Sequence, residues 1–402
     1  MYLSLSWRNI WRNKKRTLIA AASVFFAVLT AIVMRSAQTG SYAYMIHSSA
    51  KLYSGYLQIQ GKGYWENRSM DRSIILSDKD YQFIHSTPHV TSATPRLEGF
   101  ALVSNDSATK VAQVIGTNPE LENKMTNLKD KLVKGSFLDD QSQGTLVAEG
   151  LANMLKLQIG DSLVLYGQGY HGQIAAAIYP VAGIVKMPFQ ELNNGLVFLN
   201  LKTAQQFFSA PGRITSLAVM IENQKYLDET ITHLSKLDQY AILPWTEMMP
   251  DLVQSIELDN ASGIIMLIIL YIVITFGVFG TVMMMVSERL KEFGILISVG
   301  MRKWRLITVT TIESIFIAFV GVIIGIIGSI PIVYYLHLNP IHITGEATKT
   351  FDSLGIEPIF NFSTDPNLFF AQAFVVFLIA LAAALYPLFY IRKLKPVQAL
   401  HS

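Results

Sequence analysis

The stretch ERLKEFGILISVGMRKWR, residues 288–305, joins two of the most apolar segments of the chain, GIIMLIILYIVITFGVFGTVMMMV before it and ITVTTIESIFIAFVGVIIGIIGSIPIVYYL after it. Leu290, Phe293 and Ile297 follow the spacing of one helical face, and charged residues stand between them. The stretch therefore predicts a short amphipathic helix that is tied to two membrane spans and receives a soluble partner. A membrane-surface helix with no partner is the alternative.

The composition is that of a membrane protein with a water-exposed part. Of the 402 residues, 51% are hydrophobic and 15% are charged, whereas globular chains carry about 25% charged residues. The mean hydropathy is +0.36. The net charge of +3 is small, and the lack of cysteine excludes disulfides, thiolate metal sites and cysteine nucleophiles.

Four runs are long and apolar enough to cross a bilayer, which takes roughly 20 residues. They extend from Thr17 to Met34, between Asp259 and Glu288, from Leu306 to Leu336, and between Asp365 and Arg392. The first run is too long for a signal peptide and no A-x-A-like site follows it, so we expect an uncleaved span. Basic residues cluster before the first span, between the second and third, and after the fourth. Their placement predicts that both termini and the opening stretch are cytoplasmic.

Residues 1–16, MYLSLSWRNIWRNKKR, predict an amphipathic helix at the cytoplasmic membrane interface. On a helix, Trp7 and Trp11 lie near one another at headgroup depth, and Arg8 and Arg12 are among the polar positions. An ordinary basic flank that only sets the topology is the alternative.

Residues 55–245 are expected to form a mixed α/β domain outside the cytoplasm, as one domain or two intertwined subdomains. Strand character is found in GYLQIQ, GFALVS, KVAQVIG, GTLVAEG, DSLVLYG, YPVAGIV, LVFLN and ITSLAVMIE. Helical spacing is found in LANMLKL, LKTAQQFF and YLDETITHLSKL. The stretches that lead from the first span and into the second also have helical spacing and predict stalks.

No pattern for catalysis or metal binding is found. His85 and His89 are four apart, but Pro88 argues against a helix that would align them. The domain lacks HExxH spacing and a G-x-S-x-G elbow, and the chain lacks a GxxxxGK[ST] phosphate loop. We therefore expect no metal, no cofactor and no ATP hydrolysis by this chain. A secondary transporter is disfavoured because four spans are few and Glu313 is the only ionisable candidate within one.

Two features of the third span point to contacts. Glu313 lies about two turns from the cytoplasmic end. It is either a coupling residue that faces a partner helix or a glutamate paired locally, with Arg302 or Arg305 within reach. A second feature is a smooth helix face that predicts close packing, with a dimer contact as one place for it. Its residues are Gly321, Gly325 and Gly328.

The opening stretch resembles the coupling segment of MacB/FtsX/LolC-LolE-type ABC transporter permeases, E-R-x-x-E-[FI]-G-[IV]-L-x-[SA]-[VLI]-G-M. Three other stretches agree, in the family's order. SWRNIWRNKKRTLI is similar to the amphipathic N-terminal helix, TLVAEGLANMLKLQIGDSLVLYG to an extracytoplasmic segment, and YPLFYIRKLKPVQAL to the closing signature. The stretch ISVGMRKW departs from many relatives and leaves the partner unidentified.

The resemblance implies a permease with four transmembrane helices and a MacB-like periplasmic core domain between the first two. Two permease chains, identical or different, would bind two soluble ABC ATPase subunits and transmit ATP-driven motion to the outer domains. Because this chain begins almost directly with the amphipathic helix, we expect the ATPase on a separate subunit. We expect no nucleic-acid partner. The expected ATPase contacts are Glu288, Arg289, Glu292, Phe293 and Gly294.

We expect release of lipoproteins from the inner membrane. MacB-like export of another extracytoplasmic substrate and FtsX-like regulation of a cell-wall hydrolase are the alternatives, although the FtsX outer domain is usually much smaller. The expected organisation is an interface helix 1–16, span and stalk 17–54, outer domain 55–245, stalk and span 246–286, coupling helix 287–304, span 305–336, outer loop 337–365, span 366–391 and cytoplasmic tail 392–402.

Overall fold

The computed structural model describes residues 14–105, 108–139, 142–188, 190–342, 344–345 and 359–393. The chain divides into two compact units. The helical unit contains residues 1–42, 255–342 and 359–402, and the inserted domain contains residues 43–254 and 343–358.

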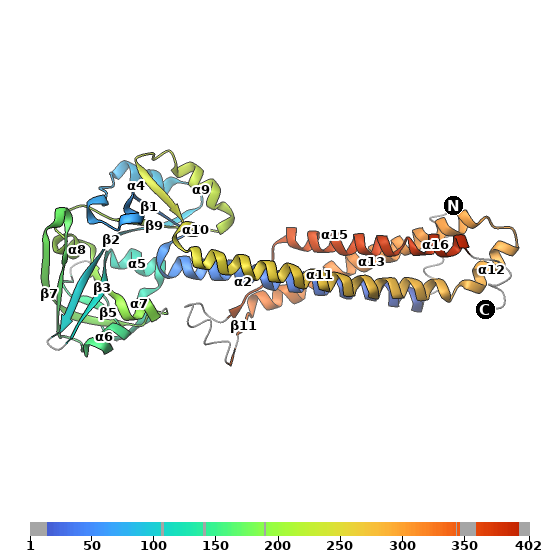
Figure 1. The fold of residues 1–402 in the computed structure, drawn as a ribbon, viewed down its shortest axis with the longest axis horizontal. Coiled ribbons are helices and arrows are strands. Elements are labelled where there is room, and N and C mark those ends of the chain that lie inside the picture. The colour runs from blue at the N-terminus through green and yellow to red at the C-terminus, as the bar shows by residue number, and fades with distance from the viewer. Residues whose placement is uncertain are drawn as a thin grey trace. The chain divides into compact units, whose positions relative to one another are not determined.

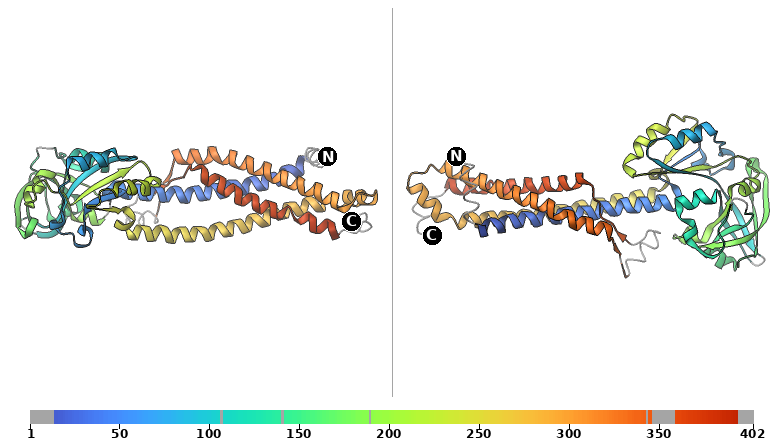
Figure 2. Two further views of the ribbon diagram at one scale, coloured as in Figure 1. Left: turned by 90° about the horizontal axis from the view of Figure 1, so that it is seen from above. Right: turned by 180° about the vertical axis from the view of Figure 1, so that it is seen from behind.

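Four helices of the described chain are long and apolar enough to cross a membrane. They are α2 (Lys14–Ser49), α11 (Pro250–Ser287), α13 (Lys303–Leu338) and α15 (Pro366–Ala383), and they run side by side in Figures 1 and 2. The predicted four-span architecture is confirmed. Short elements complete the helical unit: α12 (Leu290–Ser298), α16 (Tyr386–Lys393), and the strand pair β11 (Ile341–His342) and β12 (Ile359–Phe360).

The helical unit has a core to which each long helix contributes. Val28, Val278, Val322 and Val376 come from α2, α11, α13 and α15, and each is less than 9% exposed. Gly325 allows α13 to approach α2 closely, because a Cβ at that position would lie 2.7 Å from the Cβ of Val28. Small residues permit such close helix contacts in membranes.

A polar cluster joins α2 to α11 at the end away from α12. The Arg35 guanidinium donates to the side-chain oxygen of Asn260 at 3.1 Å. The Tyr42 hydroxyl donates to the Asp259 carboxylate at 2.5 Å and accepts from the Gln38 amide at 2.8 Å. These bonds hold the two helices together where each continues towards the inserted domain along the chain.

The inserted domain is built on a ten-stranded sheet. Its strands are β1 (Leu57–Gly61), β2 (Val90–Asn105), β3 (Ala108–Thr117), β4 (Leu132–Gly135), β5 (Thr145–Ala148), β6 (Ser162–Gln168), β7 (Ile174–Val185), β8 (Leu196–Asn200), β9 (Ser216–Ile221) and β10 (Tyr240–Pro244). The order is β10-β1-β9-β2-β3-β8-β5-β7-β4, and β6 pairs with both β2 and β7. The strands β2, β3, β8, β5, β7 and β6 therefore form a closed ring.

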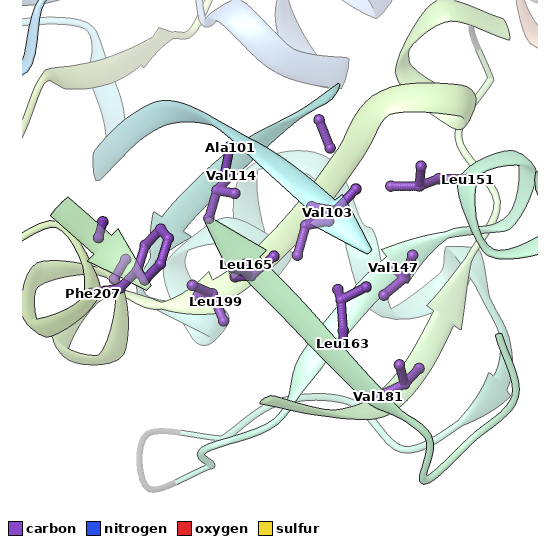
Figure 3. Packing of buried hydrophobic residues seen from close by; sticks show 14 of the residues in the cluster. Ala101, Val103, Val114, Val147, Leu151, Leu163, Leu165, Val181, Leu199 and Phe207 are labelled. Carbon is purple, nitrogen blue, oxygen red and sulfur yellow. The ribbon is translucent and has the colours of Figure 1, made fainter. Parts of the chain in front are cut away.

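The long strand β2 makes this ring possible. Its first half pairs with β9, at positions such as Ala93 opposite Val219, and its second half pairs with β6, where Leu102 lies opposite Tyr166. Alternate residues of the ring strands point inward, as the period of a strand requires. Val103, Val114 and Leu163 lie in the resulting core (Figure 3), and all three are fully buried.

Helices surround the sheet: α3 (Tyr64–Asn67), α4 (Asp78–Ser86), α5 (Pro119–Thr126), α6 (Glu149–Leu155), α7 (Gln190–Gly195), α8 (Leu201–Phe207), α9 (Leu227–Leu234) and α10 (Trp245–Met248). The predicted mixed α/β class is confirmed. The helices α4 and α5 were not predicted, and both start at a polar N-cap. In α5 the Asn118 side chain accepts from the Leu121 N–H at 2.9 Å.

Candidate functional site

The charged stretch after α11 folds as the predicted short helix, α12, and ends in a Schellman motif. The Met301 N–H donates to the Leu296 carbonyl at 2.9 Å, and the Gly300 N–H donates to the Ile297 carbonyl at 3.0 Å. Gly300 has a φ of +103°, which side chains disfavour. This glycine therefore ends α12 and turns the chain back towards α13.

One face of α12 is fixed to the helical unit. Phe293 is 3% exposed and packs in a cluster with Val286 of α11, Leu306 and Ile307 of α13, and Ile391 of α16. Three other helices thus hold the inner face of α12, so a force on α12 acts on the whole cluster.

The opposite face is exposed and mixes apolar with charged side chains. Ile295 is 53% exposed, Leu296 41% and Val299 83%. The charged side chains of Glu288 and Glu292 are exposed beside them. Protein interfaces combine apolar and polar side chains, and this face has both.

A buried ion pair lies behind α12. Arg289 is the N-cap residue of α12, and Glu313 lies in α13. Arg289 Nη1 donates to Glu313 Oε2 at 2.6 Å, and Arg289 Nη2 donates to Glu313 Oε1 at 2.8 Å. Arg289 is 4% exposed and Glu313 is fully buried. The two-bond geometry fixes both the distance and the orientation between the start of α12 and α13.

The five residues expected to contact an ATPase thus divide into two sets. Glu288 and Glu292 are exposed, whereas Arg289, Phe293 and Gly294 are buried within the chain. Arg289 and Phe293 make their contacts within the helical unit, whereas the side chains of Glu288 and Glu292 are accessible.

Glu313 is paired locally, as one of the two alternatives proposed, but its partner is Arg289. Arg302 and Arg305, the arginines considered from sequence, are both exposed. The pair was not predicted, because its members are 24 positions apart on different helices. The available signal was one acidic residue in an apolar span with a basic residue just outside the neighbouring span.

The three glycines of the third span pack within the chain. A Cβ on Gly321 would lie 2.7 Å from the Cβ of Val24, and one on Gly328 would lie 2.7 Å from the ring of Phe25. Gly325 meets Val28 in the same way, so this glycine face is occupied by α2. The predicted interface residues Trp7, Arg8, Trp11 and Arg12 lie outside the described residues.

The inserted domain holds its buried charges in structural contacts. Arg96 and Glu122 are 1% and 2% exposed, and they form two hydrogen bonds of 2.9 and 2.6 Å. Burial lowers the pKa of Lys131 to about 8, and its Nζ donates to the Thr126 carbonyl at 2.8 Å. Within the described ranges, no three His, Asp or Glu side chains are placed to hold a metal ion.

Two family models match the chain. The MacB-like periplasmic core domain matches residues 17–237, more than half of the chain, and the FtsX-like permease C-terminal model matches residues 264–396. The first match covers most of the inserted domain together with α2. The second covers the spans α13 and α15, most of α11, and α12 with its ion pair.

The chain is similar to several named proteins. The lipoprotein-releasing system transmembrane protein LolC of Xylella fastidiosa is 24% identical over 329 residues, 78% of each chain. LolE of the same system in Haemophilus influenzae is 23% identical over 347 residues, 79% of each chain. The macrolide export ATP-binding/permease protein MacB of Vibrio parahaemolyticus is 22% identical over 326 residues, which make up 78% of this chain and 49% of that protein.

Among solved structures, the periplasmic region of MacB from Actinobacillus actinomycetemcomitans matches with a TM-score of 0.35 and 16% identity over 49% of this chain and 91% of that chain. The extracellular domain of the transporter YknZ from Gram-positive bacteria matches with a TM-score of 0.34 and 12% identity over 46% of this chain and 97% of that chain. The two family matches, taken with the four spans and the inserted α/β domain, show that this chain belongs to the MacB-like, FtsX-like superfamily of ABC transporter permeases.

Proposed function

We propose that this chain is the permease subunit of an inner-membrane ABC transporter complex that releases lipoproteins. A soluble ATPase subunit binds the exposed face of α12, and a second permease chain, identical or different, completes the complex. ATP-driven movement of α12 is transmitted through the helical unit to the inserted domain. ATP is bound by the partner subunit and not by this chain.

One observation carries the proposal. α12 has an exposed face of apolar and acidic side chains, including Ile295, Leu296 and Glu292, while its other face is packed against three helices. A connection that only joins two spans needs neither feature. A helix that receives force from a soluble protein needs both, because the contact must be accessible and the motion must not be lost in a flexible loop.

The proposed orientation follows from the basic residues. Lys14 and Lys15 begin α2, Arg302 and Lys303 adjoin α12, and Lys393 ends α16. These groups lie at one end of the membrane helices by chain connectivity. The positive-inside rule favours that end as the cytoplasmic one. The inserted domain then lies on the outer side, where lipoproteins are anchored.

The similarity to LolC and LolE along nearly four fifths of this chain supports lipoproteins as the substrate. Export of another substrate that is already outside the cytoplasm is the second candidate. It is favoured by the similarity to MacB and by the match of the inserted domain to the MacB-like core.

Copurification tests the proposal. The chain is tagged and extracted from native membranes in several mild detergents, and bound proteins are identified by mass spectrometry. The wild-type chain should recover a soluble ABC ATPase, and Glu292→Lys should lose it because the charge on the contact face is reversed. Glu66→Lys, an equal reversal at an exposed site in the inserted domain, is the matched control.

The bound material then separates the two candidates. Copurifying proteins that carry fatty acyl groups support lipoprotein release, whereas a small molecule or peptide without acylated proteins supports the export function. If the wild-type chain recovers no ATPase in any detergent, the transporter proposal is contradicted and α12 is better explained as a membrane-surface helix.

A further inference from the structure

The Arg289–Glu313 pair is buried behind the exposed face of α12. In the described part of the chain, the Arg289 guanidinium has no acceptor besides Glu313, and its Nε has no hydrogen-bond partner at all. The pair is therefore an isolated two-residue contact. If either side chain is removed, the other is left as a buried and unpaired charge.

Stability alone does not explain such a pair. Removing two charges from water is costly, and well-packed apolar residues of similar size often stabilise a protein as much or more. The pair holds two segments in a defined orientation, because two parallel N–H···O bonds allow little sliding or rotation between the segments that bear the two side chains. Here the bonds join the N-cap residue of α12 to the first half of α13.

Buried apolar residues near the pair contact α2. Met285 lies one helical turn before Arg289, and Ile317 lies one turn after Glu313. Both are buried in one cluster with Ala20 and Ala21 of α2. The ion pair thus lies beside an apolar cluster formed by α2, α11 and α13.

Further along α13, the glycine face continues the same contact. Gly321 and Gly325 bring the α13 backbone against Val24 and Val28 of α2. Close-packed helices of this kind move together, because a shift of one would create overlap or a void. α2 itself runs without a break from Lys14 to Ser49 and enters the inserted domain at residue 43.

We infer that Arg289 and Glu313 are positioning residues that transmit displacement of α12 to α13, and through the glycine face of α13 to α2 and the inserted domain. This inference rests on the proposed function, since it assumes that an ATPase moves α12. The displacement passes through this ion pair and then along the contact between α13 and α2. The Phe293 cluster also packs α12 against α13, but its apolar contacts are not directional, whereas the two hydrogen bonds of the pair hold the orientation of α12 relative to α13.

The test uses two variants of the full chain in its complex with the ATPase. Arg289→Met/Glu313→Leu replaces the pair with apolar side chains of similar size, which keeps the packing and removes the two directional bonds. Glu313→Gln leaves Arg289 charged and unpaired, so it measures the effect of the unpaired charge. Arg305→Met, which removes an exposed arginine nearby, is the matched control.

The readout is hydrogen exchange of the segment Ala50–Ser54, the π-helical turn that follows α2 within the inserted domain, with and without ATP and orthovanadate. In the wild-type complex and in Arg305→Met, the nucleotide should change the exchange rate by at least about threefold. In Arg289→Met/Glu313→Leu the change should be lost, although the thermal stability is close to wild type and the ATPase still copurifies. Glu313→Gln should lose both the change and thermal stability.

The results distinguish the inference from the function on which it rests. A wild-type nucleotide response in the stable double variant overturns the inference and leaves the proposed function intact. A wild-type chain that recovers no ATPase overturns the proposed function, and the inference with it.

Discussion

The buried pair Arg96–Glu122 allows a sharp test of how the inserted domain is stabilised. Glu122→Gln keeps the size and shape of the side chain but removes the charge that compensates Arg96, which is 1% exposed. Breaking a buried ion pair by removing one partner costs about 3–5 kcal/mol. We therefore expect the free energy of unfolding of the domain to fall by about this amount.

Hydrogen exchange in the full-length chain measures the loss. Strand β9 is buried along its whole length, so its amides exchange when the domain as a whole unfolds. Since each 1.4 kcal/mol is a factor of ten, Glu122→Gln should accelerate exchange in β9 roughly 100- to 4,000-fold. Glu120→Gln, on the same helix but exposed, should accelerate it much less.

A double variant separates charge from packing. Arg96→Met/Glu122→Leu removes both charges, and the Thr117 hydroxyl, which also bonds Glu122, still has the Pro95 carbonyl at 3.2 Å. Most of the lost stability should return. If Glu122→Gln stays within tenfold of the wild-type exchange rate, the pair does not stabilise the domain as its burial implies.

Three further predictions concern other contacts. Gly325→Ala should lower the thermal stability of the detergent-solubilised chain by roughly 1–3 kcal/mol through overpacking against α2, whereas Gly277→Ala, where a Cβ meets no atom within 4 Å, should not. Lys131 has a pKa of about 8 when folded and 10.5 when unfolded, so domain stability should rise between those pH values, and Lys131→Met should abolish the rise in denaturant titrations. Asn118→Ala should cost about 1 kcal/mol by removing the N-cap of α5, measured by exchange in that helix.

Much of the membrane architecture could be predicted because it depends on local composition. A helix must satisfy its own backbone hydrogen bonds in lipid, so each long apolar run has one available structure. The amphipathic spacing of Phe293 and its neighbours in the same way predicts the helix α12. The strand segments were found because β-branched and large apolar residues alternate or cluster between turn residues.

The exposed face of α12 shows the limit of such patterns. The family resemblance placed Glu292 and Phe293 in one contact set, but a helix places neighbouring residues on different faces, and only packing shows which face is covered. Phe293 is covered by three other helices and Glu292 is not. Gly294 was expected to contact the ATPase because it stands in the coupling-segment pattern of the family, whereas it is buried within the chain.

The sequence by itself determined the number of spans, the position of the inserted domain and the presence of a short helix after α11, since each follows from residues close together in the chain. The tertiary structure decided the rest. It alone closed the strand ring around β2, paired Arg289 with Glu313, and set the glycines of α13 against α2. These contacts join residues from 24 to about 300 positions apart, and no local periodicity records which distant surfaces meet, because that choice depends on how all elements pack at once.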